Sequence, residues 1–236
     1  MKDNNLPSFL IENRILLDAG SVCSVLTVEE QLKIEAVFIS HSHFDHINDL
    51  PFLVDNFSIS GKSLQVCGTE FTIAALKTHI FNNTIWPDFS KIPSSSEPSL
   101  QYCKLNFFEE ISIGNLEIIP FPVIHIKGSC GFVVRDGETA FAYTSDTYKS
   151  DGMWEIFEKY GVKSVITECS FPSARNKLAE VSKHFSTGHL KEELKKNKSV
   201  GKIYIFHAKP MFRESIEKEL DGLGIELLKD NTEITV

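Results

Sequence analysis

The sequence predicts an α/β fold, built as a four-layer αββα sandwich in which helices lie outside two mixed sheets. Three observations predict it. Strand-type runs alternate with helix-type runs from residue 8 to residue 82, a strand-rich stretch spans Leu100–Tyr143, and the alternation then resumes to the end of the chain. Two mixed halves of this kind each need helices to cover one face of a sheet, which gives the four layers.

The first half opens with strands. Residues Ser8–Gly20 read as two short strands joined tightly at Glu12–Asn13, and Ile34–Ser40 is a β-rich apolar run. Three alternating elements follow: a helix beginning in His46–Phe57, a strand at Ser63–Gly68 and a helix over Thr69–Asn82 with Thr69 as its N-cap. The stretch Trp86–Ser99 is rich in Pro and Ser and has no periodicity, which predicts a loop or an insertion that covers something.

The second half begins with strands again. Residues Leu116–Ile124 form one strand, and the Asp136–Gly137 pair between two apolar runs indicates a hairpin within Gly131–Tyr143. The predicted order after it is helix 151–161, strand 162–170, helix 186–197, strand 201–210, helix 210–224, and closing strands at 225–228 and 232–236.

Composition limits the possible functions. A chain of 236 residues with 42% hydrophobic residues and no linker or internal repeat predicts one domain over residues 1–236. The formal net charge of −8 disfavours a long nucleic acid as partner and favours a small ligand. Five scattered cysteines indicate a reducing compartment. Because no signal sequence or membrane span is visible, we expect a cytoplasmic protein.

The stretch "HSHFDH" carries the chemistry. It concentrates His41, His43, Asp45 and His46 within six positions, in a chain that has eight histidines in total. The cluster follows the predicted strand Ile34–Ser40, and α/β folds commonly place ligands at the carboxyl ends of strands. Imidazole nitrogens suit zinc or iron, and a neighbouring carboxylate can hold a second ion or a water molecule. A cluster of solvated loop residues is the alternative, but only a metal gains from this density of imidazole.

At these four residues the sequence resembles the metallo-β-lactamase superfamily, whose HxHxDH motif they match without a gap. The resemblance implies three further ligands, each after a strand, and His125, Asp146 and His207 occupy those places. It also implies how the seven divide: His41, His43 and His125 on one ion, Asp45, His46 and His207 on the other, and Asp146 bridging both. Within "ILLDAG", Asp18 is then the expected hydrogen-bond acceptor behind the ligand histidines.

Shorter motifs are similar to those of the class II cyclic-nucleotide phosphodiesterases. They are "SDT" around Asp146, "ECSF" from Glu168, "GHL" at His189 and "H-x-KP" from His207 to Pro210. The resemblance implies Asp45 and His189 as catalytic residues, with His189 and Lys209 contacting the substrate phosphate. Taken by position alone, His189 could equally be a surface or capping residue, and Lys209 a solvated loop lysine.

The chemistry implied is hydrolysis of a phosphodiester by two divalent ions. Zinc is the first expectation, with manganese or iron as alternatives. Two such ions about 3.5–4 Å apart share a hydroxide, make it nucleophilic near neutral pH and stabilise the phosphoryl oxygens. A 3′,5′-cyclic nucleotide attacked in line would release a 5′-monophosphate. The partner is therefore a small-molecule phosphodiester, and the sequence leaves a homodimer open.

Three other functions use the same fold. A tRNA 3′-processing endoribonuclease would need a basic arm, which the acidic charge balance disfavours. A thioester or lactone hydrolase would direct the same hydroxide at a carbonyl group. A di-iron redox protein of this fold tends to replace the second histidine of the motif with glutamate, whereas His43 is present here.

Four remaining residues carry weaker expectations. His79 fits a helix surface, and no motif marks His184. Glu168 at a strand end could orient a ligand or simply be solvated. Cys169 is expected to be a buried small residue rather than a nucleophile.

Overall fold

The computed structural model describes residues 5–150, 152–197 and 199–235. The chain forms two compact units, residues 1–106 and 107–236, and each is described by itself. Asp151, at the start of a predicted helix, and Val236, at the end of a predicted strand, lie outside the described residues. The expectation of a single domain over the whole chain stays a prediction.

Within the described part of the first unit, one sheet has five strands in the order β1-β2-β3-β4-β5. Their bounds are β1 Phe9–Ile11, β2 Ile15–Leu17, β3 Ala36–Ile39, β4 Leu64–Thr69 and β5 Leu100–Leu105. Strands β1 and β2 pair antiparallel, and the other neighbours pair parallel. Three residues separate β1 from β2, and Ile11 pairs with Ile15. Glu12 and Asn13 in this turn are both at positive φ (48° and 56°), and the backbone N–H of Arg14 donates to the carbonyl of Ile11 at 3.0 Å, which closes a tight turn. The predicted hairpin is confirmed.

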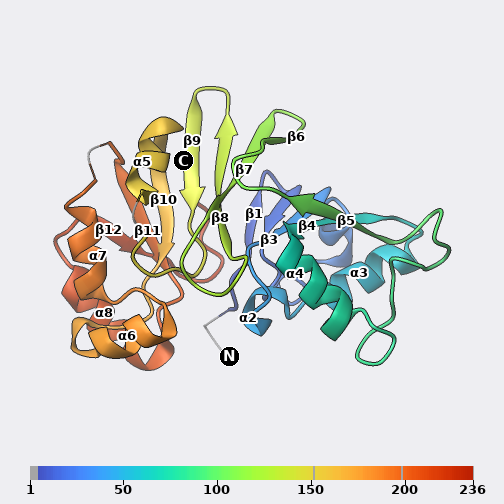
Figure 1. The fold of residues 1–236 in the computed structure, drawn as a ribbon, viewed down its shortest axis with the longest axis horizontal. Coiled ribbons are helices and arrows are strands. Elements are labelled where there is room, and N and C mark those ends of the chain that lie inside the picture. The colour runs from blue at the N-terminus through green and yellow to red at the C-terminus, as the bar shows by residue number, and fades with distance from the viewer. Residues whose placement is uncertain (1–4, 151, 198, 236) are drawn as a thin grey trace. The chain divides into compact units, whose positions relative to one another are not determined.

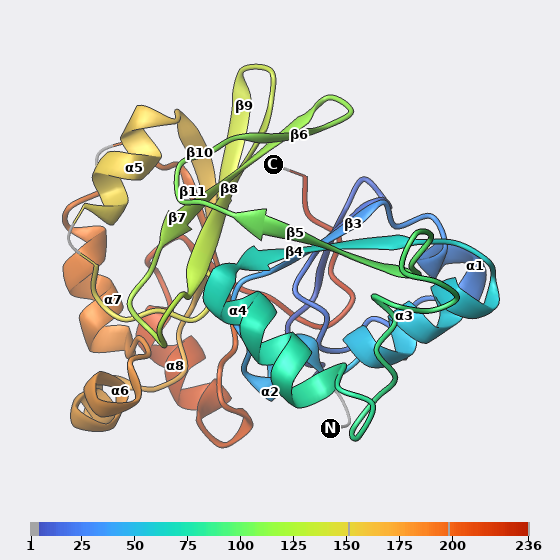
Figure 2. The same cartoon turned by 45° about the vertical axis from the view of Figure 1, so that its right-hand side comes forward.

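Helices cover one face of this sheet, as Figures 1 and 2 show for α3 and α4 beside β3–β5. The helices are α1 Val28–Gln31, α2 Phe44–Ile47, α3 Leu50–Ile59 and α4 Glu70–Ala75, with a π-helical turn at Leu76–Ile80. Val37 and Val66 on the sheet belong to one buried cluster with Leu53 and Phe57 of α3. As predicted, Thr69 caps α4, because its side-chain oxygen accepts a hydrogen bond from the backbone N–H of Thr72.

The second unit, in its described residues, contains a seven-stranded sheet in the order β12-β11-β10-β9-β8-β7-β6. The bounds are β6 Ile111–Ile113, β7 Leu116–Pro122, β8 Cys130–Asp136, β9 Thr139–Tyr143, β10 Val162–Glu168, β11 Lys202–Phe206 and β12 Ile225–Leu227. Strands β6 to β9 are antiparallel and β9 to β12 are parallel. Because β9, β10 and β11 are parallel neighbours, residues at their carboxyl ends meet at one sheet edge.

Helices α5 Met153–Lys159, α6 Asn176–Ser182, α7 Thr187–Leu194 and α8 Arg213–Leu220 belong to this unit, with 3₁₀ turns at Ser173–Arg175 and Pro210–Phe212 (Figure 1). Phe157 of α5, Leu190 of α7 and Ile216 of α8 share a buried cluster with Val165 and Ile205 of the sheet. The mixed α/β fold with two sheets and helices is confirmed. Helix α6 was not expected from the sequence.

Two segments outside these elements, residues 86–99 and 232–235, can be compared with the sequence predictions. Residues 86–99 contain no helix and no strand, as expected for a loop, with one isolated bridge between Pro93 and Pro98. The predicted closing strand at 232–236 is wrong for its described part: residues 232–235 form no strand, and the sheet ends at β12. An alternating pattern of apolar and polar residues does not form a strand unless a neighbouring strand offers backbone groups for pairing.

None of the helices in the described residues is both long and apolar enough to cross a bilayer.

Candidate metal centre

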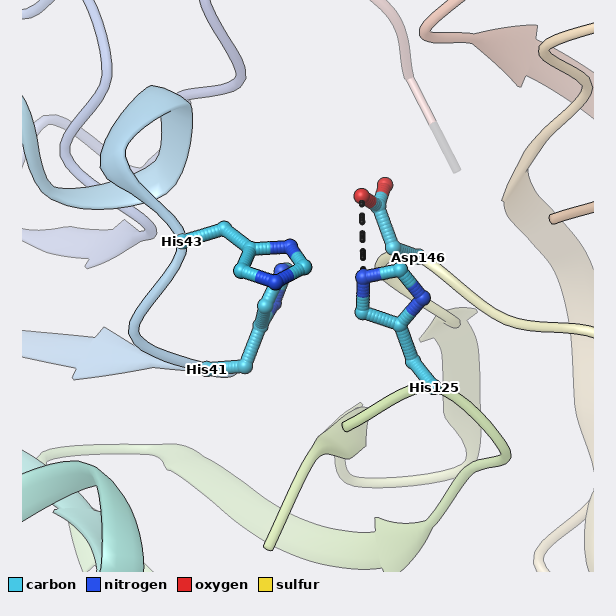
Figure 3. Close-up of side chains that lie close together, drawn as sticks. All are labelled: His41, His43, His125 and Asp146. Carbon is cyan, nitrogen blue, oxygen red and sulfur yellow. Dashed lines mark ion pairs between the residues drawn. The ribbon is translucent and has the colours of Figure 1, made fainter. Parts of the chain in front are cut away.

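The histidine loop, residues 41–46, lies in the first unit where β3 ends and α2 begins. The ring centroids of His41 and His43 are 4.7 Å apart, and those of His41 and His46 are 4.2 Å apart. His41 and His46 are buried, whereas His43 and Asp45 are partly exposed. Figure 3 shows His41 and His43 leaving the same short segment after the strand. The first unit therefore brings three imidazoles and one carboxylate into one loop.

Asp18 orders this loop from behind. The residue follows β2, is fully buried, and has a left-handed backbone with φ of 57°. One carboxylate oxygen, Oδ1, accepts the backbone N–H of Ser40 at 2.8 Å. The other, Oδ2, accepts the hydroxyl of Ser40 at 2.8 Å and faces Nδ1 of His46 at 2.7 Å. Asp18 therefore stands behind the loop and binds both Ser40 and His46.

These hydrogen bonds select the tautomer of two rings. Because a carboxylate can only accept, Nδ1 of His46 carries the proton and Nε2 keeps its lone pair. The hydroxyl proton of Ser40 is also directed at Asp18, so the Ser40 oxygen accepts from Nδ1 of His41 at 3.0 Å. Nε2 of His41 then keeps its lone pair as well. Both rings present the nitrogen that can bind a metal.

Gly20 explains why the loop can approach β2 so closely. The backbone N–H of Ala19 donates to the carbonyl of His46 at 2.8 Å, and the N–H of Gly20 donates to the carbonyl of Pro7 at 2.9 Å. A Cβ atom on Gly20 would overlap the carbonyl oxygen of Asp45 and lie 2.6 Å from Cβ of Leu6. Only glycine fits between these backbones, which accounts for the "DAG" sequence.

In the second unit, Asp146 lies between two histidines. It follows β9, is 1% exposed, and comes after Ser145, which has a left-handed backbone with φ of 55°. Oδ2 of Asp146 is 3.7 Å from Nε2 of His125, the pair dashed in Figure 3. Oδ1 of Asp146 is 3.2 Å from Nδ1 of His207. Asp146 therefore directs one carboxylate oxygen toward the ring of His125 and the other toward the ring of His207.

His125 is held from its other side. Its Nδ1 lies 3.0 Å from the carbonyl oxygen of Lys183, an acceptor, so Nδ1 carries a proton, and Nε2 is the nitrogen on the side of Asp146. His207 follows β11, with Ser170 Oγ 3.1 Å from its Nδ1 and the ammonium of Lys209 3.3 Å from its Nε2. Lys209 is thus partly buried against a site histidine, not a freely solvated loop residue.

Glu168 and His184 form a buried pair that sequence analysis did not assign. Glu168 ends β10 and is fully buried, so the solvated alternative is wrong. Its carboxylate accepts the backbone N–H groups of Thr147, Ser170 and Phe185 at 3.0–3.3 Å. Oε1 also lies 2.7 Å from Nδ1 of His184.

Burial is the largest single effect and favours the neutral ring of His184, but the charge of Glu168, its hydrogen bond and the charge of Asp146 together outweigh burial and raise the pKa of His184. Glu168, His184 and His207 bring three ligating atoms within 4.8 Å of one another. His184 therefore belongs to the same sheet edge as Asp146 and His207. Its partner is 16 residues away in sequence, so no local spacing could have revealed the pair.

His189 occupies a separate position in the second unit. It lies in the first turn of α7, where its backbone N–H donates to the capping hydroxyl of Ser186 at 3.2 Å. The residue is 7% exposed, and its ring packs edge-on against Tyr148, with centroids 5.1 Å apart. Among the described residues its Nδ1 has no hydrogen-bond partner. Burial, and then the charge of Lys149, lower the pKa of His189. His189 is thus neither a surface group nor a capping side chain.

Two other expectations are met. His79 is exposed on the π-helical turn after α4. Cys169 is fully buried, and burial together with the charge of Glu168 raises the pKa of its thiol well above the usual value, as expected for an inert residue.

The donor chemistry fits divalent metal ions. Imidazole nitrogens and carboxylate oxygens are the ligands that zinc, manganese and iron accept. His41, His46 and His125 each have Nδ1 directed to an acceptor within their own unit. This second hydrogen bond is the usual companion of a metal-binding histidine.

Comparison with known proteins identifies the family. The family model described as "Beta-lactamase superfamily domain" matches residues 13–202, which is most of the chain. The chain belongs to this superfamily. A metallo-beta-lactamase fold protein from Bacillus subtilis superposes with a TM-score of 0.72 at 18% identity, over 94% of this chain and 87% of that protein. The predicted fold class is confirmed.

Two curated relatives within the superfamily have enzyme names. A 3′,5′-cyclic-nucleotide phosphodiesterase of Aliivibrio fischeri is 29% identical over 216 residues, covering 72% of this chain and 64% of that protein. A ribonuclease Z of Methanococcus maripaludis is 30% identical over 116 residues, covering 47% of this chain and 35% of that protein. The chain therefore spans about two thirds or less of these relatives. The sequence-based assignment to this superfamily is confirmed.

Proposed function

We propose that this protein is a binuclear metal-dependent phosphodiesterase that hydrolyses 3′,5′-cyclic nucleotides to 5′-monophosphates. One observation carries the proposal: His41, His46 and His125 each have Nδ1 directed to an acceptor, so that Nε2 is available to a metal. The likeness to a named cyclic-nucleotide phosphodiesterase over 216 residues supports the substrate class.

The proposed ligands come from both units. His41, His43 and His125 would hold one ion, Asp45, His46 and His207 the other, and Asp146 both. The assignment requires the histidine loop and the edge at Asp146 to meet in the active protein. Within the second unit it is supported by the two oxygens of Asp146, one near His125 and the other near His207. When bound, the ions supply a nucleophile at neutral pH and neutralise the charge that builds on the phosphoryl oxygens.

Side chains of this chain would do the rest. Asp45, partly exposed, would accept the proton of the attacking water at a carboxylate oxygen. Lys209 would place its ammonium next to the substrate phosphate, since it lies 3.3 Å from His207. His189 would bind the phosphate or the departing oxygen through Nδ1, because leaving a buried polar atom without a partner costs about 1–3 kcal/mol unless a ligand satisfies it.

A second candidate is hydrolysis of RNA. The likeness to a ribonuclease Z, which extends over 116 residues, favours this second candidate. A polyanionic substrate would need many Lys and Arg contacts, whereas the chain has 24 basic against 32 acidic residues. The cyclic nucleotide is therefore the first substrate to test.

The experiment measures turnover of protein loaded with zinc or manganese on cyclic AMP, bis-p-nitrophenyl phosphate and a tRNA precursor. Products are identified by chromatography. Asp146→Ala is the blank, and Asp136→Ala, which removes an exposed carboxylate on the β8–β9 hairpin, is the matched control. Thermal unfolding checks that both variants fold.

We expect 5′-AMP from the wild type and from Asp136→Ala, and none from Asp146→Ala. Cleavage of the synthetic diester alone would refute the cyclic-nucleotide substrate and retain the phosphodiesterase. Cleavage of the tRNA precursor alone would establish the second candidate. No turnover by metal-loaded protein would direct the search to thioesters, lactones or redox chemistry.

A further inference from the structure

Two cysteines of the first unit face each other across neighbouring strands. In the parallel pairing of β4 with β5, Cys67 is in register with Cys103. Side chains of register partners in a sheet lie on the same face. Val66, the neighbour of Cys67, belongs to the buried cluster under α3, so the two cysteines lie on the opposite face of the sheet. Both are free thiols.

The spacing of the strands allows a covalent link. Neighbouring strands lie about 4.7–4.9 Å apart, and disulfides join Cα atoms about 4.4–6.8 Å apart. Cysteine side chains at register partners of neighbouring strands extend in parallel, which does not match the preferred dihedral angles of a disulfide. A disulfide here would therefore be strained and easily reduced. Strand β5 ends the sheet order in the described residues, so β4 is the one strand of this sheet that pairs with it there.

The two thiols differ in a way that sets the order of events. Cys67 is fully buried, whereas Cys103 is partly exposed. The hydrogen bond from Cys67 lowers the pKa of Cys103 to about 7, and the same bond together with burial raises the pKa of Cys67. Cys103 is therefore both the accessible thiol and the one that ionises near neutral pH, and Cys67 stands beside it as the second sulfur.

We propose that Cys67 and Cys103 are a redox modification site, in which a hydroperoxide oxidises Cys103 and Cys67 then closes a reversible disulfide between β4 and β5. In the first step the Cys103 thiolate attacks one peroxide oxygen, an S–O bond forms, and the O–O bond breaks to release hydroxide or alkoxide.

In the second step the sulfur of Cys67 attacks the sulfur of Cys103. An S–S bond forms, the S–O bond breaks, and the departing hydroxide takes the thiol proton of Cys67 as water. Overall, two thiols lose two electrons and two protons. Hydrogen peroxide is reduced to two water molecules, and an organic hydroperoxide to one water molecule and one alcohol.

The lowered pKa sets the expected rate. At pH 7 about half of Cys103 is thiolate, whereas a thiol with the ordinary pKa of 9.0 is about one hundredth thiolate. The thiolate of lower pKa is also less nucleophilic, which reduces the resulting gain in rate by about eightfold. We expect Cys103 to react about fivefold faster than an equally exposed ordinary thiol.

The test exposes the metal-free wild-type protein to hydrogen peroxide and follows intact mass and mapped peptides. The expected result is the loss of two hydrogen atoms per chain, a linked peptide pair containing Cys67 and Cys103, and full reversal by dithiothreitol. Cys23→Ser is the matched control, because Cys23 is also partly buried in the first unit and has no part in the link. It should behave like the wild type.

Two variants separate the roles. Cys67→Ala should stop at a sulfenic acid on Cys103 that dimedone captures, and Cys103→Ala should leave Cys67 reduced. The proposal is overturned if the linked peptide is absent while Cys103 oxidises, or if the link joins two chains. It is also overturned if Cys103→Ala leaves the rate of hydrogen loss unchanged. None of these readouts depends on hydrolytic activity, so the test of the disulfide is independent of the test of the proposed function.

Discussion

Replacing Asp18 with asparagine changes one atom behind the histidine loop. The amide oxygen can still accept the backbone N–H of Ser40, and asparagine tolerates the left-handed backbone at this position. The amide nitrogen, however, takes the place of Oδ2, which now serves the Ser40 hydroxyl and Nδ1 of His46. An N–H group there donates, so His46 must accept at Nδ1 and carry its proton at Nε2.

The expected result is a loss of metal affinity without a loss of fold. With its proton on Nε2, His46 cannot bind a metal until the tautomer is reversed against the amide donor. Changes to the hydrogen-bond partner of a ligand histidine typically cost about 10–100-fold in metal affinity. That range corresponds to about 1.4–2.8 kcal/mol. The proposed second ion should be affected, since His46 is assigned to it.

The assay is competition with a chelator of known affinity, together with metal content by elemental analysis. Asp49→Asn is the matched control: Asp49 is also a buried carboxylate of the first unit, and it accepts hydrogen bonds from Cys23 and Asn48 at 2.8 Å. Asp49→Asn should keep wild-type affinity. An Asp18→Asn protein that binds both ions within twofold of wild type would refute the tautomer argument.

His189→Ala should retain the metals and lower turnover about 100-fold, the range for a lost proton donor or phosphate contact, and an unchanged kcat would exclude a catalytic role. Gly20→Ala should lower the free energy of unfolding by about 1–3 kcal/mol in a denaturant titration, because the added Cβ overlaps the carbonyl of Asp45; equal stability would contradict the close approach. Zinc at about 100 times its Kd should stabilise the metal-free protein by about 2.7 kcal/mol, seen as a higher Tm, and Asp146→Ala should not respond. Alkylation of Cys103 should rise with pH around a midpoint of about 7, because the thiolate forms as pH passes the lowered pKa, and a midpoint near 9 would count against the hydrogen bond from Cys67.

Local signals explain which elements could be predicted. The pair Glu12–Asn13 between apolar runs has residue types that tolerate a tight turn, and Thr69 precedes a helical pattern. Helix α6 lacks such a signal, because its N-cap residue is Arg175 and makes no side-chain cap. Helix α1, by contrast, carries a capping box between Thr27 and Glu30, a local signal from which its start can be predicted.

The same distinction holds for the candidate site. The histidine loop is local in sequence and stands out by composition, and the more distant site residues could be placed only through the family resemblance. The pairing of Glu168 with His184 depends instead on how α6 returns the chain to the end of β10, with Lys183 in a left-handed conformation (φ 55°) just before His184. A contact that depends on tertiary packing leaves no spacing pattern, so sequence reasoning left His184 unassigned.

Asp18, Ser145 and His207 share left-handed backbones, with φ of 57°, 55° and 59°, at the strand ends that carry the site. A non-glycine residue in this conformation costs about 1–2 kcal/mol. Directed evolution for thermal stability alone would therefore favour glycine or asparagine at these positions. At His207 it would enrich well-folded chains that have lost a proposed metal ligand, and at Asp18 chains that have lost the hydrogen-bond acceptor behind the histidine loop. A stability screen of this protein must be coupled to a selection for metal retention, because the two properties are in conflict at these residues.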